Sequence, residues 1–241
     1  MGAYNTVFVE TAVLAGLCMV AVVICRGKVD WGWLLGALVL FAAHKATVFL
    51  GVVGLAPDLI PGRYNWEGKA LGVLMLLIAG YVIFRGDMKA WGFTLSQNGP
   101  APVAGISVAV LTAGATAAFM YLYFPGVKTE PLADWTYQLT MPSLDEELID
   151  RGILLVMLER AFHKAFPKGW LAIGLAAVIT TLMFYAGHAM SVGADWSITI
   201  VWLDIVSLIT GALYVFVRIA TGSVLLPVLL HSWFNTAGYL L

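Results

Sequence analysis

The stretch SLDEELIDRG, residues 143–152, is central to interpreting this chain, because it gathers four carboxylates and an arginine in a sequence that otherwise avoids charge. Only 11% of the 241 residues are charged and 61% are hydrophobic, with a mean hydropathy of +0.91. An average soluble domain has roughly 25% charged residues. The composition therefore predicts a membrane protein with a few concentrated polar sites.

Apolar runs on both sides of this stretch are long enough to cross a hydrocarbon core of ~30 Å. We expect an all-α polytopic bundle with an intramembrane pocket and eight spans, at 6–25, 31–55, 70–84, 103–124, 146–160, 171–190, 197–217 and 222–241. Residues 1–125 would supply four helices and residues 126–241 the other four, in one integrated membrane domain. The net charge of −1 offers no basic surface for nucleic acid, so the expected partners are lipids and membrane-embedded chains.

The polar connection at 125–145 is expected to be a loop, and its end has the signature of a helix start. Ser143 followed three residues later by Glu146 is a capping-box pattern, so the carboxylates are predicted to begin a helix. On that helix Glu147 and Arg151, four residues apart, face one another as an ion pair. Glu146 stacks with Asp150 instead, so two carboxylates share one environment.

Two later spans also carry polar side chains. The sixth ends LMFYAGHAM, with Phe184 one turn before His188, and the eighth reads TGSVLLPVLLHSWFNTAG, with His231 and Asn235 on one face. At 1.5 Å per residue, Glu146, both histidines and Asn235 reach similar depths in antiparallel helices. The sequence therefore predicts that these four side chains meet in a pocket within the membrane.

Such a set suits hydrolysis of an amide without a protein nucleophile. A carboxylate and a histidine position and deprotonate water, while a second histidine and an asparagine donate hydrogen bonds to the developing oxyanion. The alternative is a zinc site formed by Glu146, His188 and His231, with a fourth position for water. We favour the metal-free site, because an amide is a poor zinc ligand and no cofactor is then required.

The three motifs resemble those of the CPBP family, the CAAX-processing and bacteriocin-processing intramembrane proteases. The family patterns EExxxR, FxxxH and HxxxN appear in order as Glu146-Glu147-xxx-Arg151, Phe184-xxx-His188 and His231-xxx-Asn235, and the likeness covers about residues 140–238. It implies that Glu146 and His188 activate water and that His231 and Asn235 form the oxyanion site. Glu147, Arg151, Asp150 and Phe184 would support them.

The resemblance also implies a membrane-anchored or lipid-modified protein or peptide substrate, cut near its membrane-associated C-terminal region, and a prokaryotic plasma membrane. A transporter or channel also buries Glu, His and Asp, and an inactive scaffold would keep the same fold. Position 150 departs from the family, where an apolar or aromatic residue is more usual. Asp150 therefore tunes Glu146, orients substrate, or pairs with a basic residue elsewhere.

Other intramembrane polar residues have weaker interpretations. We expect His44 and Lys45 to snorkel or to form a structural pair rather than to contact substrate, because they lie within the second span. Asp204, in the seventh span, would line the pocket or anchor a neighbouring helix.

Lysine and arginine are distributed unevenly between the two sets of connections. Those after odd-numbered spans hold Arg26, Lys28, Arg85, Lys89, Arg160, Lys164, Lys168 and Arg218, and those after even-numbered spans hold Arg63, Lys69 and Lys128. Because Lys and Arg concentrate in cytoplasmic loops, this bias predicts termini and an active site that face the extracytoplasmic side.

Overall fold

The computed structural model describes residues 2–57, 59–60, 64–124, 126, 131–201 and 204–240. Most of the described residues are helical, and the two strands have only three residues each, which confirms the all-α class. The main elements are α1 (Gly2–Ile24), α2 (Trp31–Val52), α3 (Trp66–Ile83), η1 (Met88–Trp91), α4 (Pro102–Tyr123), α5 (Leu132–Glu147), η2 (Leu148–Leu154), α6 (Leu155–Phe162), α7 (Trp170–Ala189), β1 (Met190–Val192), β2 (Ile198–Ile200), α8 (Ile205–Thr221), α9 (Leu225–Thr236) and η3 (Ala237–Tyr239).

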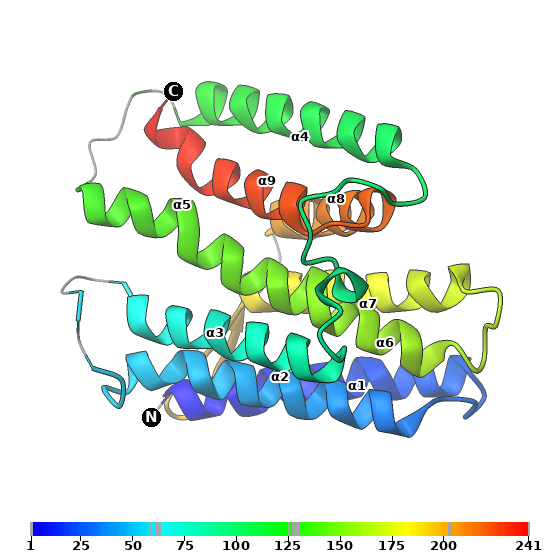
Figure 1. The fold of residues 1–241 in the computed structure, drawn as a ribbon. Coiled ribbons are helices and arrows are strands. Elements are labelled where there is room, and N and C mark those ends of the chain that lie inside the picture. Colours follow the sequence, from blue (N-terminus) through cyan, green and yellow to red (C-terminus); the bar gives the residue numbers. More distant parts are fainter. Residues whose placement is uncertain are drawn as a thin grey trace.

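The long helices run roughly parallel and antiparallel across a single bundle (Figure 1). Helix α5 lies between a layer formed by α4, α8 and α9 and a layer formed by α1, α2 and α3, and it packs against both α9 and α3. The larger hydrophobic core joins α1, α2, α3, α6 and α7, whereas a smaller one joins α4, α8 and α9. The carboxylates of α5 therefore lie where the two layers meet.

Among the described residues, five helices are long and apolar enough to cross a membrane, namely α1, α2, α3, α4 and α7. Large apolar side chains cover their outward faces; Val23 on α1 and Val103 on α4 are each about three-quarters exposed. Such exposure would be unfavourable in water and is favourable against lipid. The prediction of a polytopic membrane protein is confirmed, and the first four predicted spans agree with α1 to α4 within a few residues.

The predicted helix start at Ser143 is wrong, and the predicted loop at 125–145 is wrong for residues 132–145, which are helical. Residues 125 and 127–130 of that loop lie outside the described residues. The helical segment begins at Leu132 and continues through α5, η2 and α6 to Phe162, with Pro142 and Ser143 inside it. Ser143 instead accepts or donates a 2.7 Å hydrogen bond with the Ser232 hydroxyl of α9. Packing between α5 and α9 thus carries the helix past a proline that normally ends one.

The η2 segment, Leu148–Leu154, is a stretch of π-helix. Such wide turns are rare and occur frequently at functional sites. The later spans also differ from expectation: part of the predicted seventh span forms the strand β2, which pairs antiparallel with β1, and the final two helices begin at Ile205 and Leu225.

Side-chain caps fix the ends of α2 and α3. Asp30 accepts hydrogen bonds from the amides of Gly32 and Trp33, and its carboxylate pairs with Lys164 at 3.0 Å. The Lys164 ammonium and then the Trp33 amide hold the pKa of Asp30 below its usual range. The contact fastens the connection between α6 and α7 to the start of α2, at the end of the bundle away from the chain termini (Figure 1).

Candidate active site

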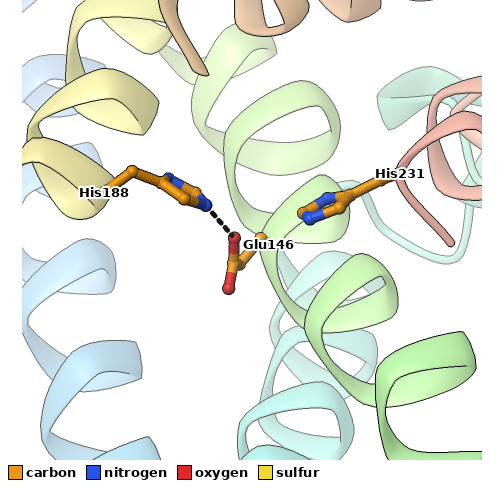
Figure 2. Close-up of side chains that lie close together, drawn as sticks. All are labelled: Glu146, His188 and His231. Atoms are coloured by element: carbon orange, nitrogen blue, oxygen red, sulfur yellow. Dashed lines mark ion pairs between the residues drawn. The ribbon is translucent and has the colours of Figure 1, made fainter. Parts of the chain in front are cut away.

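Glu146, His188 and His231 come from α5, α7 and α9 and meet between the two layers (Figure 2). One oxygen or nitrogen atom from each lies within 4.8 Å of the others. His188 Nε2 is 3.7 Å from Glu146 Oε2, longer than a hydrogen bond. The predicted convergence of these three side chains is confirmed.

The ring of His231 is held from behind by Glu147. Its Nδ1 lies 2.9 Å from Glu147 Oε1, and both side chains are buried. A carboxylate accepts hydrogen bonds, so Nδ1 carries the proton of this contact. The other ring nitrogen, Nε2, is therefore not needed to hold His231 in place.

His188 is anchored in the same way by its own helix. Its Nδ1 lies 2.8 Å from the backbone oxygen of Phe184, one turn earlier, and a carbonyl oxygen only accepts hydrogen bonds. The Phe184 ring lies 4.3 Å from the His188 ring and 5.6 Å from the His231 ring, between centroids. The phenylalanine of the second motif thus supports both histidines.

The predicted ion pair between Glu147 and Arg151 is confirmed. Arg151 Nη1 is 3.1 Å from Glu147 Oε1, and neither side chain is exposed. Arg151 also donates to the backbone oxygen of Gly211 at 3.3 Å and lies 4.1 Å from the centroid of the Phe184 ring. The arginine therefore connects the first motif to α7, which carries the second motif, and to α8.

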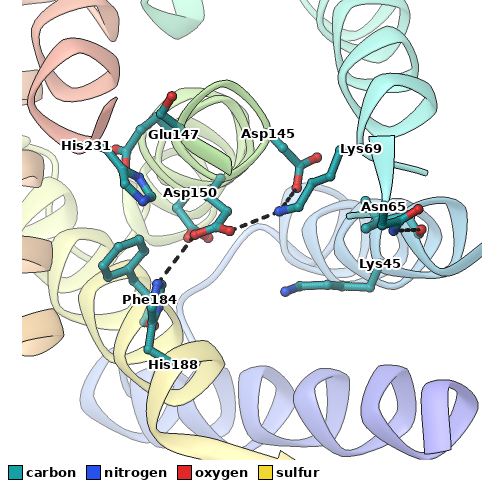
Figure 3. Close-up of polar contacts among 12 residues, drawn as sticks. Lys45, Asn65, Lys69, Asp145, Glu147, Asp150, Phe184, His188 and His231 are labelled. Carbon is teal, nitrogen blue, oxygen red and sulfur yellow. Dashed lines mark hydrogen bonds and ion pairs between the residues drawn. The ribbon is translucent and has the colours of Figure 1, made fainter. Parts of the chain in front are cut away.

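A polar cavity of about 300 Å³ is lined by Glu146 and His188, and Asp150, His44 and Lys45 also line it. Figure 3 shows Lys45, Asp150 and His188 of this wall. The expectation that Glu146 and Asp150 share an environment is therefore confirmed. The nearest cation to Asp150 is its sequence neighbour Arg151, at 3.7 Å.

His44 and Lys45 form structural pairs within this cavity wall. His44 Nε2 lies 2.7 Å from Asp145 Oδ1, and Lys45 Nζ lies 2.8 Å from Glu10 Oε2 of α1.

A second cavity, of about 310 Å³, lies on the opposite side of His188. Asn235 lines it together with both histidines, whereas Glu146 is not among its lining residues, so Asn235 shares a cavity with the histidines only. Asp204, the residue before α8, also lines it, as one of the two alternatives predicted. Most of the remaining wall is apolar or aromatic, so the three motif residues stand between a polar and an apolar cavity.

Lys69 is a site residue that the sequence analysis counted only as a loop charge. Its ammonium lies 2.9 Å from Glu146 Oε1 and 2.7 Å from Asp145 Oδ2, and its side chain is 14% exposed. Figure 3 shows it reaching from α3 toward the carboxylates of α5. The available signal was a lysine at the start of an apolar span, which needs a buried acid as its partner.

Residues 128–237 match the model of the family described as type II CAAX prenyl endopeptidase Rce1-like. The match contains all three motifs and confirms the family predicted from them. Helices α1 to α4 lie outside it. Comparison with curated proteins and with solved structures found no match.

Proposed function

The chain belongs, through residues 128–237, to the type II CAAX prenyl endopeptidase family, and we propose that it is an intramembrane endopeptidase acting on a membrane-anchored or lipid-modified protein or peptide. The observation that carries the proposal is the gathering of Glu146, His188 and His231 between a polar and an apolar cavity inside a helical bundle. Carboxylates and imidazoles are costly among apolar helices and are retained there mainly for function.

Glu146 and His188 are the proposed water-activating pair. Their facing atoms are 3.7 Å apart, too far for a direct hydrogen bond and suitable for a water molecule that contacts both. Glu146 in its ionised form accepts a proton from that water. The hydroxide equivalent then attacks the carbonyl carbon of the scissile peptide bond, and the proton passes to the leaving amine.

His231 and Asn235 are the proposed donors to the oxyanion. Asn235 donates from its side-chain amide. His231 already uses its Nδ1 proton on Glu147, so it donates from Nε2 only as an imidazolium. The buried carboxylate of Glu147 stabilises that positive charge, which gives the second glutamate of the first motif a direct part in the chemistry.

Zinc dependence is the second candidate mechanism, and the same hydrogen bonds favour it. With both Nδ1 atoms donating, each neutral ring presents an Nε2 lone pair on its other side, and Glu146 adds a carboxylate oxygen. Backbone and carboxylate acceptors behind the histidines are the usual support of a zinc site. Glu146, His188 and His231 would hold the ion, which would supply Lewis acidity and an acidified water.

The charges around the site also bear on this choice. In the three groups of ion pairs around the site, carboxylates exceed lysines and arginines by two: Glu10, Asp145, Glu146, Glu147 and Asp150 against Lys45, Lys69 and Arg151. Buried charge is stable only when it is compensated. A divalent cation would provide the missing charge, and so would two protonated histidines.

Metal analysis of the active protein decides between the two mechanisms. The metal-free site predicts less than about 0.1 zinc per chain and full activity after chelation. Stoichiometric zinc, with activity lost on chelation and recovered on adding the metal back, would establish the zinc site as the mechanism.

The apolar cavity favours a substrate that is anchored in the membrane. It shares Phe119, Val206, Thr210 and Phe234 with a neighbouring groove of about 450 Å³ between α4 and α8, whose lining side chains are apolar except for three threonines. A hydrophobic segment or lipid chain entering there would bring the adjoining peptide to His231. The polar cavity on the far side of His188 would then receive the other end of the substrate.

The test is cleavage of peptides with and without a lipid group by the purified protein, followed by mass spectrometry. We expect one defined cut in the lipid-modified peptide, absent with Glu146→Gln and reduced on the order of 10²-fold in kcat, more than in KM, with Asn235→Ala. Cleavage that survives Glu146→Gln would contradict the proposal. Flux of a solute across vesicles without any cleavage would instead identify a transporter.

A further inference from the structure

The ammonium of Lys69 lies between two neighbouring carboxylates of α5. It is 2.9 Å from Glu146 Oε1 and 2.7 Å from Asp145 Oδ2, and it comes from α3, outside the region that matches the family model. Both contacts have the length of charge-assisted hydrogen bonds. One buried cation therefore links the proposed catalytic glutamate to a helix of the N-terminal half.

The position of Lys69 is fixed by how α3 begins. Asn65 caps the helix by accepting from the Gly68 amide, and its side-chain nitrogen donates to the backbone oxygen of Val48 on α2. A Cβ atom at Gly68 would lie 2.0 Å from that same oxygen, so only glycine permits this approach of the two helices. Lys69, the next residue, is thereby held against α5.

Asp145 is fixed in turn by His44. The two side chains are almost fully buried, with His44 Nε2 2.7 Å from Asp145 Oδ1, while Lys69 occupies the other oxygen, Oδ2. The chain of contacts runs from α2 to α5, then to α3, and back to α5. Its end point is one oxygen of Glu146.

Lys69 determines which oxygen of Glu146 faces the reaction. Oε1 is bound to the ammonium, whereas Oε2 is the atom that faces His188 across 3.7 Å. A carboxylate without this partner would rotate between several positions and would lie next to Asp145, whose carboxylate would keep only its contact with His44. Holding one oxygen leaves the other aimed at the position proposed for water.

We propose that Lys69, supported by Asp145 and His44, is a positioning residue for Glu146, so that the active site is completed by α2 and α3. The inference rests on the proposed function of Glu146. It makes the N-terminal helices part of the catalytic machinery, although the family model covers only residues 128–237.

The test compares four side chains at position 69 in the full-length protein, using cleavage of the lipid-modified peptide. Relative to the lysine, we expect Lys69→Met to lower kcat about 10- to 100-fold, the usual effect of removing a group that orients a ligand or catalytic residue, with KM changed less than about 2-fold. Lys69→Gln keeps a hydrogen-bond donor, and Lys69→Arg keeps the charge. The expected order of kcat is Lys, Arg, Gln, Met.

The order distinguishes positioning from packing. If the side chain at position 69 only filled space, the Lys69→Met variant would have a kcat close to that of the parent, because methionine has nearly the volume of lysine and is favourable to bury. Lys164→Met is the matched control: it removes another ion-paired lysine, 61% exposed and bound to Asp30, and should leave kcat unchanged.

Thermal unfolding in detergent shows whether each variant is folded, and if Lys69→Met is not, Lys69→Gln decides by the same criterion. A folded Met or Gln variant with kcat within about 2-fold of the parent would overturn the positioning role. Glu146→Gln, assayed alongside, keeps the two proposals separate. If that variant retains activity, the function proposed for Glu146 fails, whatever the result at Lys69.

Discussion

Replacing Arg151 by methionine should be among the most destabilising single changes in the chain. The guanidinium is fully buried and lies 3.1 Å from Glu147 Oε1, whose side chain is also 0% exposed. Methionine fills much of the same space but leaves the Glu147 carboxylate buried without the guanidinium, with only the hydrogen bond from His231 Nδ1. Removing one partner of such a pair costs about 3–5 kcal/mol in the free energy of unfolding.

Removing the Glu147 carboxylate together with Arg151 tests whether the loss of stability comes from the uncompensated buried charge. In the double variant Glu147→Gln/Arg151→Met the buried carboxylate is gone, and the glutamine oxygen still accepts a hydrogen bond from His231 Nδ1. We expect the double variant to be more stable than Arg151→Met by at least about 1 kcal/mol, since contacting residues couple by amounts of this order.

The assay is denaturant unfolding in detergent micelles, followed by tryptophan fluorescence. Arg160→Met provides a control at the end of the same helical segment, because Arg160 lies over the rings of Trp33 and Phe84 at 4.7 and 4.8 Å. Its loss should cost about 0.5–1 kcal/mol, the range for exposed cation–π contacts. Equal effects at the two arginines, or a double variant no more stable than Arg151→Met, would refute the buried-charge explanation.

Two further predictions concern the α3 contact and the orientation of the bundle. Gly72→Ala should lower kcat and should also lower the free energy of unfolding by about 1–3 kcal/mol, the range for an overpacked site, because the added Cβ would lie 2.8 Å from Asp145 Oδ1. The control is Gly114→Ala, where the added Cβ meets open space. Equal effects of the two substitutions would contradict the steric cause. The orientation is tested with single cysteines placed at Ser191 or Lys164 in a variant without the two native cysteines. On intact cells, a membrane-impermeant thiol reagent should label the cysteine at 191 and not the one at 164. Labelling at 164 but not at 191 would reverse the orientation.

The close contacts of the site were predictable where they follow from helical spacing. Glu147 and Arg151 are four residues apart, and their ion pair survives although the chain widens into π-helix at Leu148. Depth along the spans also predicted that Glu146 would meet the two histidines. Rise per residue is a property of the helix itself, so it holds whatever the neighbours are.

The error at Ser143 has a different origin. Ser143 and Glu146 satisfy a local capping pattern, but local patterns are weak where a segment is packed on two sides. Here α5 is held by α9 through the contact of Ser143 with Ser232 and by α3 through Lys69, so the helix extends eleven residues before Ser143, to Leu132. Tertiary contacts thus decided a boundary that sequence alone assigned to a cap.

Lys69 escaped prediction because its partners are distant in the sequence. Glu146 lies 77 residues away, and no periodicity connects a position on one helix to a position on another across that interval. A sharper inference was still available from composition. A lysine at the edge of an apolar helix and two adjacent acids in another helix each need compensation, and pairing them satisfies both.

The placement of the basic residues also refines the orientation argument. Arg160, Arg218 and Lys69, which the sequence analysis assigned to connections, lie within α6, α8 and α3, and both Arg218 and Lys69 are largely buried. Removing them leaves six residues after odd-numbered spans, namely Arg26, Lys28, Arg85, Lys89, Lys164 and Lys168, and two after even-numbered spans, Arg63 and Lys128, both of which lie outside the described residues. The ratio changes from eight against three to six against two, so the bias persists once the residues found within helices are excluded. Because α1 begins and α9 ends at the same end of the bundle, the bias continues to predict extracytoplasmic termini (Figure 1). His188 lies two residues before β1, at that same end, so the substrate we expect is one whose C-terminal region reaches the site after translocation.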